Sequence, residues 1–233
     1  MIKMFHSKQE IIWSTPYIGL PKVVPIELSK RNIPEWFKEA PNQIENLDLS
    51  VKRCPGIIQF LTMGYVIPMW TDLSINIKDL GEGDFEGTWN TPSVENKFEF
   101  QTKETFINLL PQKTLTAVIK GISPWFCKTP KGVSMLFVPM LYHFNEDFET
   151  LTGIESTDIY PETNPFIALK RWGNIFIRRG TPLGMAIPIR REEFKTIIRE
   201  ETTQDNLHKL RAKVNISTKF SRGYRLAQQR ENK

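Results

Sequence analysis

The chain has 233 residues, of which 40% are hydrophobic and 11% aromatic, and its formal net charge is +5. This length fits one domain of ordinary size, and this hydrophobic content can build a core. A charge of this size does not by itself indicate a nucleic-acid-binding protein. The 16 prolines and 13 glycines favour short strands and fixed loops over long helices.

The cysteines and the N-terminal residues predict a reducing compartment. Cys54 and Cys127 lie far apart, with no second cysteine near either, so we expect free thiols and no structural zinc site. The opening residues MIKMFHSKQEIIW contain no long apolar run and no small-residue cleavage site, so we expect no signal peptide and no secretion. No apolar run approaches the roughly 20 residues of a transmembrane helix, so we expect none.

Residues 1–50 predict an irregular N-terminal arm, because their prolines prevent a long helix and interrupt any central strand. Ile33–Ala40 predicts one or two helical turns, with Pro34 at the first position, where proline is tolerated. A second short helix is expected at Gly56–Thr62, after Pro55.

The next residues predict strands. Tyr65–Ile77 is expected to be extended, with short strands following at Phe85–Trp89 and Lys97–Gln101. Apolar and polar residues alternate at period two, as in a half-buried strand: Leu73, Ile75 and Ile77 against Asp72, Ser74 and Asn76.

Residues 114–142 are rich in β-forming residues. Trp125–Lys128 and Val133–Val138 are expected to pair as a hairpin across Thr129–Gly132. Pro130 and Gly132 fit the second and fourth positions of a type I turn there.

The segment Thr150–Arg190 predicts four further strands around a polar turn and a glycine turn. Its apolar residues recur at period two, as in half-buried strands: Ile175 and Ile177, then Met185, Ile187 and Ile189. Gly180 stands where a hairpin needs a residue that tolerates a positive φ. Asp158 lies in the polar turn, where its carboxylate is placed to face a ligand.

The C-terminal segment 191–233 predicts a helix, or two helices separated near Thr202–Asp205, followed by a basic tail. The tail is a candidate contact for nucleic acid or a protein partner, through Lys209, Arg211, Lys213, Lys219, Arg222 and Arg225. The alternative is a solvated or partly disordered terminus.

No motif predicts catalysis, a cofactor or a metal site. The chain lacks GxSxG, and none of its three histidines is paired at ligand spacing. His143–Glu149 carries one histidine and three carboxylates that could hold a hard cation loosely, although acidic loops are commonly only solvated.

Most of the chain resembles an uncharacterised family of tailed-bacteriophage proteins, especially those of marine phages. The resemblance rests on PEWFKEAP, VKRCPGIIQFLTMGYVIPMWTDLSI, WFCKTPKGVSMLFVPM, TLTGIESTDIYPETNPF and IRRGTPLGMAIPIRRE, in this order and spacing. It implies a viral origin, with the host cytoplasm or the virion as the location, and no known activity.

A more distant resemblance covers about residues 114–190. TGIESTDIYP and IFIRRGTPLGMAIPI are similar to motifs of the deoxyuridine triphosphatase and deoxycytidine triphosphate deaminase superfamily, and Gly153, Asp158 and Gly180 match its pattern. The resemblance implies a β-clip fold, a frequent trimer, and a nucleotide site around Gly153, Ser156, Asp158 and Tyr160.

Several departures from that superfamily argue against its chemistry. The aspartate that activates water in the triphosphatases falls on Ser156, which cannot act as that base at neutral pH. The phosphate-binding Arg-Ser-Ser is missing from VPMLYHFNE, and Gly184-Met185 replaces the closing Ala-Gln. The resemblance suggests Glu162 as the counterpart of the deaminases' catalytic glutamate.

The sequence therefore predicts a mainly β, β-clip-like antiparallel domain at 51–190, between an irregular arm at 1–50 and a C-terminal helix and basic tail at 191–233. The first functional hypothesis is a non-catalytic phage protein that binds a host or phage macromolecule or takes part in virion assembly. The alternative is a nucleotide-binding or nucleotide-processing protein with a degenerate site.

Overall fold

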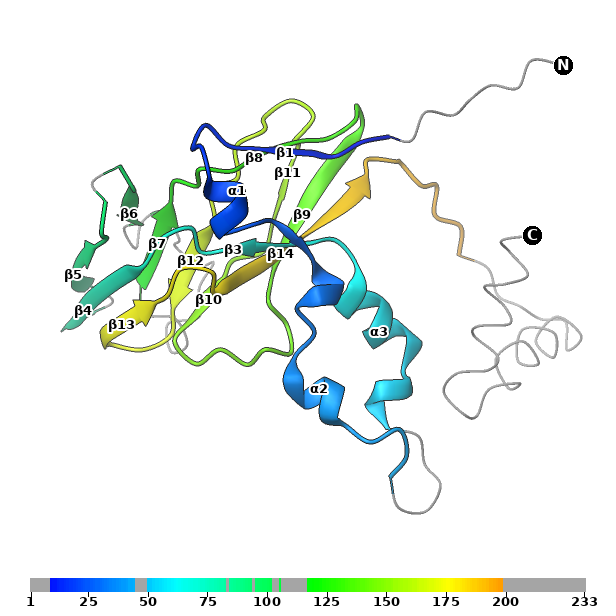
Figure 1. The fold of residues 1–233 in the computed structure, drawn as a ribbon, viewed down its shortest axis with the longest axis horizontal. Coiled ribbons are helices and arrows are strands. Elements are labelled where there is room, and N and C mark those ends of the chain that lie inside the picture. The colour runs from blue at the N-terminus through cyan, green and yellow to red at the C-terminus, as the bar shows by residue number, and fades with distance from the viewer. Residues whose placement is uncertain are drawn as a thin grey trace, which may run out of the picture. The chain divides into compact units, whose positions relative to one another are not determined.

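The computed structural model describes residues 9–44, 50–82, 84–93, 95–101, 105 and 117–198. The prediction of a mainly β, antiparallel fold is confirmed, since every strand pair among these residues is antiparallel. The α-helices that it describes are short: α1 Leu20–Val23, α2 Glu35–Glu39 and α3 Pro55–Thr62 (Figure 1).

The chain divides into two compact units, and the three predicted segments stay a prediction. One unit comprises the described parts of Met1–Leu28 and Gly64–Glu192, and the other those of Ser29–Met63 and Glu193–Lys233. The second unit contains α2 and α3, where the sequence predicts them, and the short 3-10 turns η1 (Ser29–Arg31) and η3 (Val51–Arg53). Pro34 precedes α2 and Pro55 begins α3, because neither position needs a backbone N–H donor.

Two sheets of the larger unit share its main hydrophobic cluster. The three-stranded sheet has the order β13 (Gly173–Ile177), β4 (Leu73–Gly81), β5 (Asp84–Asn90). The four-stranded sheet has the order β10 (Phe148–Thr150), β12 (Phe166–Leu169), β7 (Ala117–Gly121), β6 (Phe98–Gln101). The predicted alternation along β4 is confirmed, since Leu73, Ile75 and Ile77 are buried in this cluster while Ser74 and Asn76 are exposed.

A five-stranded sheet lies beside a second, smaller cluster. Its order is β11 (Gly153–Glu155), β9 (Val133–Pro139), β14 (Pro182–Arg190), β3 (Tyr65–Pro68), β2 (Glu27–Leu28). A two-stranded sheet of β1 (Ile12–Ser14) and β8 (Phe126–Lys128) contributes Cys127 to the cluster, which also contains Ile67, Met135 and Ala186.

Strand β14 departs from the predicted half-buried alternation. Its residues Leu183–Ile187 are buried in succession, because hydrophobic clusters cover both faces of the strand: Leu183 belongs to the larger cluster and Ala186 to the smaller one. A strand covered on both faces needs no polar face. Gly180 has the predicted positive φ, at 84°, in the turn before β14. The predicted hairpin at this turn is wrong, because β13 pairs with β4 whereas β14 pairs with β9 and β3.

The predicted hairpin of β8 and β9 is wrong. β8 pairs with β1, whereas β9 pairs with β11 and β14. A turn does separate the two strands, but the N–H of Val133 donates to the carbonyl of Pro130, one residue later than predicted. Gly132 then occupies the third position with φ 81°, which a type II turn requires.

The predicted C-terminal helix is not confirmed. Residues 191–198 have no regular secondary structure. The rest of that prediction, and the basic tail with it, lies outside the described residues.

The shared cluster predicts a sharp difference between neighbours on β4. We expect Ile75→Ala to lower the free energy of unfolding by about 2–5 kcal/mol, because it leaves a cavity between two sheets. Ser74→Ala, on the exposed face, is expected to change it by less than about 0.5 kcal/mol. Urea unfolding of both variants measures the difference, and equal losses would show that the two faces of β4 are misassigned.

Candidate functional site

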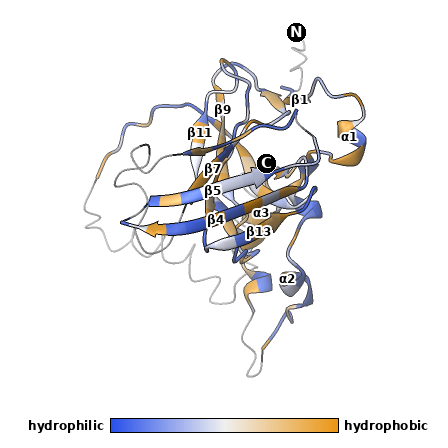
Figure 2. Cartoon of the chain, turned by 90° about the vertical axis from the view of Figure 1, so that its left-hand side faces the viewer, coloured by the Kyte–Doolittle hydropathy of each residue, from blue (hydrophilic) through white to orange (hydrophobic). Residues whose placement is uncertain are grey.

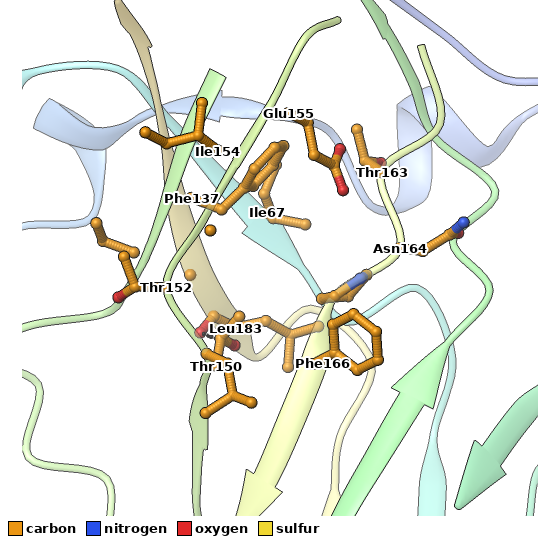
Figure 3. A pocket seen from close by; sticks show the side chains of 15 residues that line it. Ile67, Phe137, Thr150, Thr152, Ile154, Glu155, Thr163, Asn164, Phe166 and Leu183 are labelled. Carbon is orange, nitrogen blue, oxygen red and sulfur yellow. Dashed lines mark hydrogen bonds between the residues drawn. The ribbon is translucent and has the colours of Figure 1, made fainter. Parts of the chain in front are cut away.

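A pocket of about 340 Å³ opens in the larger unit. Its walls are two segments, 150–155 and 163–166, and its floor consists of residues of β3, β9 and β14. Figure 3 shows its lining side chains, most of which are hydrocarbon. A volume near 300 Å³ is at the lower end of the range for small-ligand sites.

The pocket lies where the two hydrophobic clusters meet. Leu183 belongs to the cluster between the three- and four-stranded sheets, whereas Ile67 belongs to the smaller cluster and Phe137 packs against it. Phe166 closes one side from β12. An apolar ligand group in this space would gain the transfer free energy that drives burial of hydrocarbon.

Glu155 is the one acidic side chain of this lining. It ends β11 and extends between Phe137 and Thr163 (Figure 3). Burial, reinforced by the nearby charge of Glu162 and opposed by Lys120, raises the pKa of Glu155 from 4.5 to about 7. Its Oε2 atom is buried and has no hydrogen-bond partner among the described residues. A buried acceptor without a donor is costly, so this atom is a natural site for a ligand's donor group.

A second carboxylate, that of Glu162, lies near Glu155 and, unlike it, has hydrogen-bond donors. The Oε2 atom of Glu162 accepts hydrogen bonds from the hydroxyl of Tyr160, at 2.6 Å, and the amide of Asn164, at 3.0 Å. These two donors hold the pKa of Glu162 below its usual value. The result is a charged, satisfied carboxylate beside one that is largely protonated below pH 7.

Asp158 is bound by this chain's own groups. Its carboxylate accepts two hydrogen bonds from the guanidinium of Arg191, at 2.5 and 2.9 Å, and a third from the N–H of Gly132, at 2.9 Å. Arg191 also donates to the hydroxyl of Ser134. These contacts, led by the Arg191 hydrogen bonds, lower the pKa of Asp158 to about 2. The arrangement joins the polar turn to the turn before β9 and to the end of β14.

A buried hydroxyl pair reinforces the same junction. The hydroxyl of Thr129 donates to the carbonyl of Val133 at 2.7 Å, and the Thr129 and Thr157 hydroxyl oxygens are 2.8 Å apart. Since the single Thr129 proton goes to Val133, Thr157 must be the donor of the pair.

The four residues of the predicted nucleotide site are not gathered around one space. Gly153 lines the pocket, whereas Asp158 faces Arg191 and Tyr160 donates to Glu162. Ser156 offers its carbonyl to the N–H groups of Ile159 and Tyr160. Their predicted role is untested. The basic-tail residues Lys209–Arg225 lie outside the described residues.

Sequence reasoning missed Glu155, the central polar group of the pocket. Along β11 the usual pattern of buried apolar and exposed polar side chains is reversed: Ile154 is 63% exposed, whereas the neighbouring Glu155 is half-buried. That inversion is visible only once the strand's covered side is known.

The acidic loop and the cysteines offer little chemistry. Within the described ranges, no three His, Cys, Asp or Glu residues are grouped to hold a metal ion. Asp147 of the loop pairs with Arg171 at 2.5 Å. Cys54 and Cys127 are free thiols, and burial with the charge of Glu155 raises the pKa of Cys127 to about 12, so it is not a thiolate nucleophile at neutral pH.

Comparison with known proteins finds no matching family model, no matching curated protein and no matching solved structure. Both sequence resemblances therefore remain predictions. In the part of the chain that the structure describes, no helix is long and apolar enough to span a membrane.

Glu155 predicts an unusual dependence of stability on pH. Its pKa is about 7 in the folded state and 4.5 in the unfolded state. Between these two pH values the folded state therefore keeps a proton that the unfolded state has lost. The glutamate's contribution to stability must therefore fall as pH rises from 4.5 to 7. We expect Glu155→Gln to raise the melting temperature more at about pH 8 than at about pH 5. A gain that does not change with pH would contradict the burial of this carboxyl.

Asp158 predicts the opposite dependence. Its pKa falls from 3.8 to about 2, so its contribution is full above 3.8 and is lost as pH falls through 2. We expect Asp158→Asn and Arg191→Ala each to lower the melting temperature at neutral pH. In the double variant the losses should be smaller than their sum, because each single change already breaks the same ion pair. Additive losses would show that the pair contributes no coupling.

Proposed function

We propose that this chain is a non-catalytic binding protein whose pocket beside Glu155 receives an apolar group carrying a hydrogen-bond donor. The observation that carries the proposal is a hydrocarbon-lined space containing one buried carboxyl oxygen with no donor from the described residues. An apolar body matches the floor of Ile67, Phe137 and Leu183. A hydroxyl or ammonium group would satisfy the glutamate.

The pocket suits a small group rather than a nucleotide. A volume of about 340 Å³ accommodates a ring with a short side chain, and no basic residue lines the pocket to neutralise a triphosphate. The contacts of Asp158 with Arg191 and Gly132 also argue against a nucleotide site, because a paired carboxylate is a poor metal ligand or base. The nucleotide hypothesis remains the alternative.

The bacteriophage resemblance indicates which kind of molecule would supply the apolar group that enters the pocket. It supports a side chain or terminus of a host or phage macromolecule over a free metabolite, in the host cytoplasm or the virion. A trimer and a nucleic-acid contact through the basic tail are further proposals that come from the sequence alone.

Three probes that differ only in their polar end test the ligand class: phenylpropylamine, phenylpropanol and phenylpropionate. We expect the amine and the alcohol to bind, because they donate to Glu155, and the carboxylate to be rejected by like charge. Amine binding should strengthen by about tenfold between about pH 5 and pH 8 as Glu155 ionises. Calorimetric titration of the full chain measures all three.

A blocking variant locates the binding. Thr152 is an exposed member of the pocket lining, so Thr152→Trp should occlude the pocket and abolish binding without disturbing the core. Glu86→Trp, at an exposed position of β5, is the matched control and should bind normally. Equal binding by both variants would place the probe elsewhere. Selective binding of deoxynucleoside triphosphates would instead favour the alternative function.

A further inference from the structure

The outer face of the three-stranded sheet carries an array of uncharged polar side chains. Register places Ser74 between Phe176 and Asn90, and Asn76 between Asn174 and Thr88. All six side chains are exposed. Figure 2 shows the sheet with β4 between β5 and β13, and these six residues border a shallow depression of about 590 Å³.

This composition is unusual for the solvent side of a sheet. Strands are enriched in threonine, other β-branched residues and aromatic residues, whereas asparagine is depleted in them. Here three asparagines occupy six neighbouring positions. The charged Lys78 and Glu86 face each other only in the next row. Local strand preference therefore does not account for the array.

The array also has the chemistry of a recognition surface. The amide of Asn76 donates to the side-chain oxygen of Asn174 at 2.5 Å, which orients both groups across the strands. Each side-chain amide offers both donors and an acceptor. Phe176, with 53% of its surface exposed, presents a flat apolar ring at one corner.

We propose that this face binds a neutral saccharide. Sugar hydroxyls both donate and accept, so they match side-chain amides and hydroxyls, and the apolar C–H face of a pyranose can stack on the Phe176 ring. Two rows across three strands span about 10 Å by 7 Å, the footprint of one or two sugar units. The absence of formal charge from the six positions disfavours nucleic acid and acidic glycans.

The test uses the full chain and neutral hexasaccharides of glucose, mannose, galactose and N-acetylglucosamine, with a heparin hexasaccharide as the charged comparison. Nuclear magnetic resonance of side-chain amides reports directly on Asn76, Asn90 and Asn174. We expect at least one neutral sugar to shift all three signals at millimolar concentration and heparin to shift none.

Two variants distinguish stacking from general polarity. Phe176→Ala should weaken that sugar by about tenfold, whereas Phe176→Tyr, which keeps the ring, should bind as the native chain does. Both should melt normally, because the side chain is outside the core. The inference is overturned if no neutral sugar shifts the three signals, if heparin is preferred, or if Phe176→Ala binds unchanged. The pocket beside Glu155 is separate, so failure of either proposal leaves the other standing.

Discussion

The larger unit depends on the pairing of β14 with strands on both of its sides. Its residues Gly184–Ala186 pair with β9 and β3 at once, and the hydrophobic clusters that contain Leu183 and Ala186 cover the two faces of the strand. Two glycines permit the close approach. A Cβ on Gly64 would lie 2.4 Å from the carbonyl oxygen of Ala186, and one on Gly184 would lie 2.8 Å from that of Val138. Larger residues at either position would force the strands apart.

The pocket follows from the same arrangement. β14 contributes Leu183 to one hydrophobic cluster and Ala186 to the other, and the space beside Glu155 lies where these clusters meet. The Asp158–Arg191 pair holds the turn after β11 to the end of β14, so it fixes the strand that carries Glu155. The paired aspartate thus positions the pocket wall, while the unpaired glutamate is left to meet a ligand.

The sequence predicted local structure well where one face alone is covered. The alternation around Ile75 and the helices after Pro34 and Pro55 follow from short-range physics, and the structure agrees. It failed where the outcome depends on distant partners. Nothing local to β8 indicates that it pairs with β1. Along β14, the uninterrupted apolar run Leu183–Ile187 is compatible with burial on both faces, but the period-two interpretation of this strand passed over it.

The site shows the same division. Asp158 stood out because a carboxylate in a turn resembles a ligand-binding residue, yet its partner Arg191 comes from beyond the next three strands. The sequence did not predict Glu155 as a site residue, because its perturbed carboxyl depends on the burial provided by β9 and the segment 163–166. The functional meaning of a carboxylate is therefore set by contacts that single-sequence patterns do not contain.

The most direct test of this account is a titration of the Glu155 carboxyl carbon by nuclear magnetic resonance in the full chain. A buried carboxyl in an apolar pocket should titrate with a midpoint of about 7, and a bound amine should move the midpoint downward by stabilising the ionised form. A midpoint near the ordinary 4.5 that no amine changes would mean that Glu155 is solvated. In that case the pocket would not be the binding site.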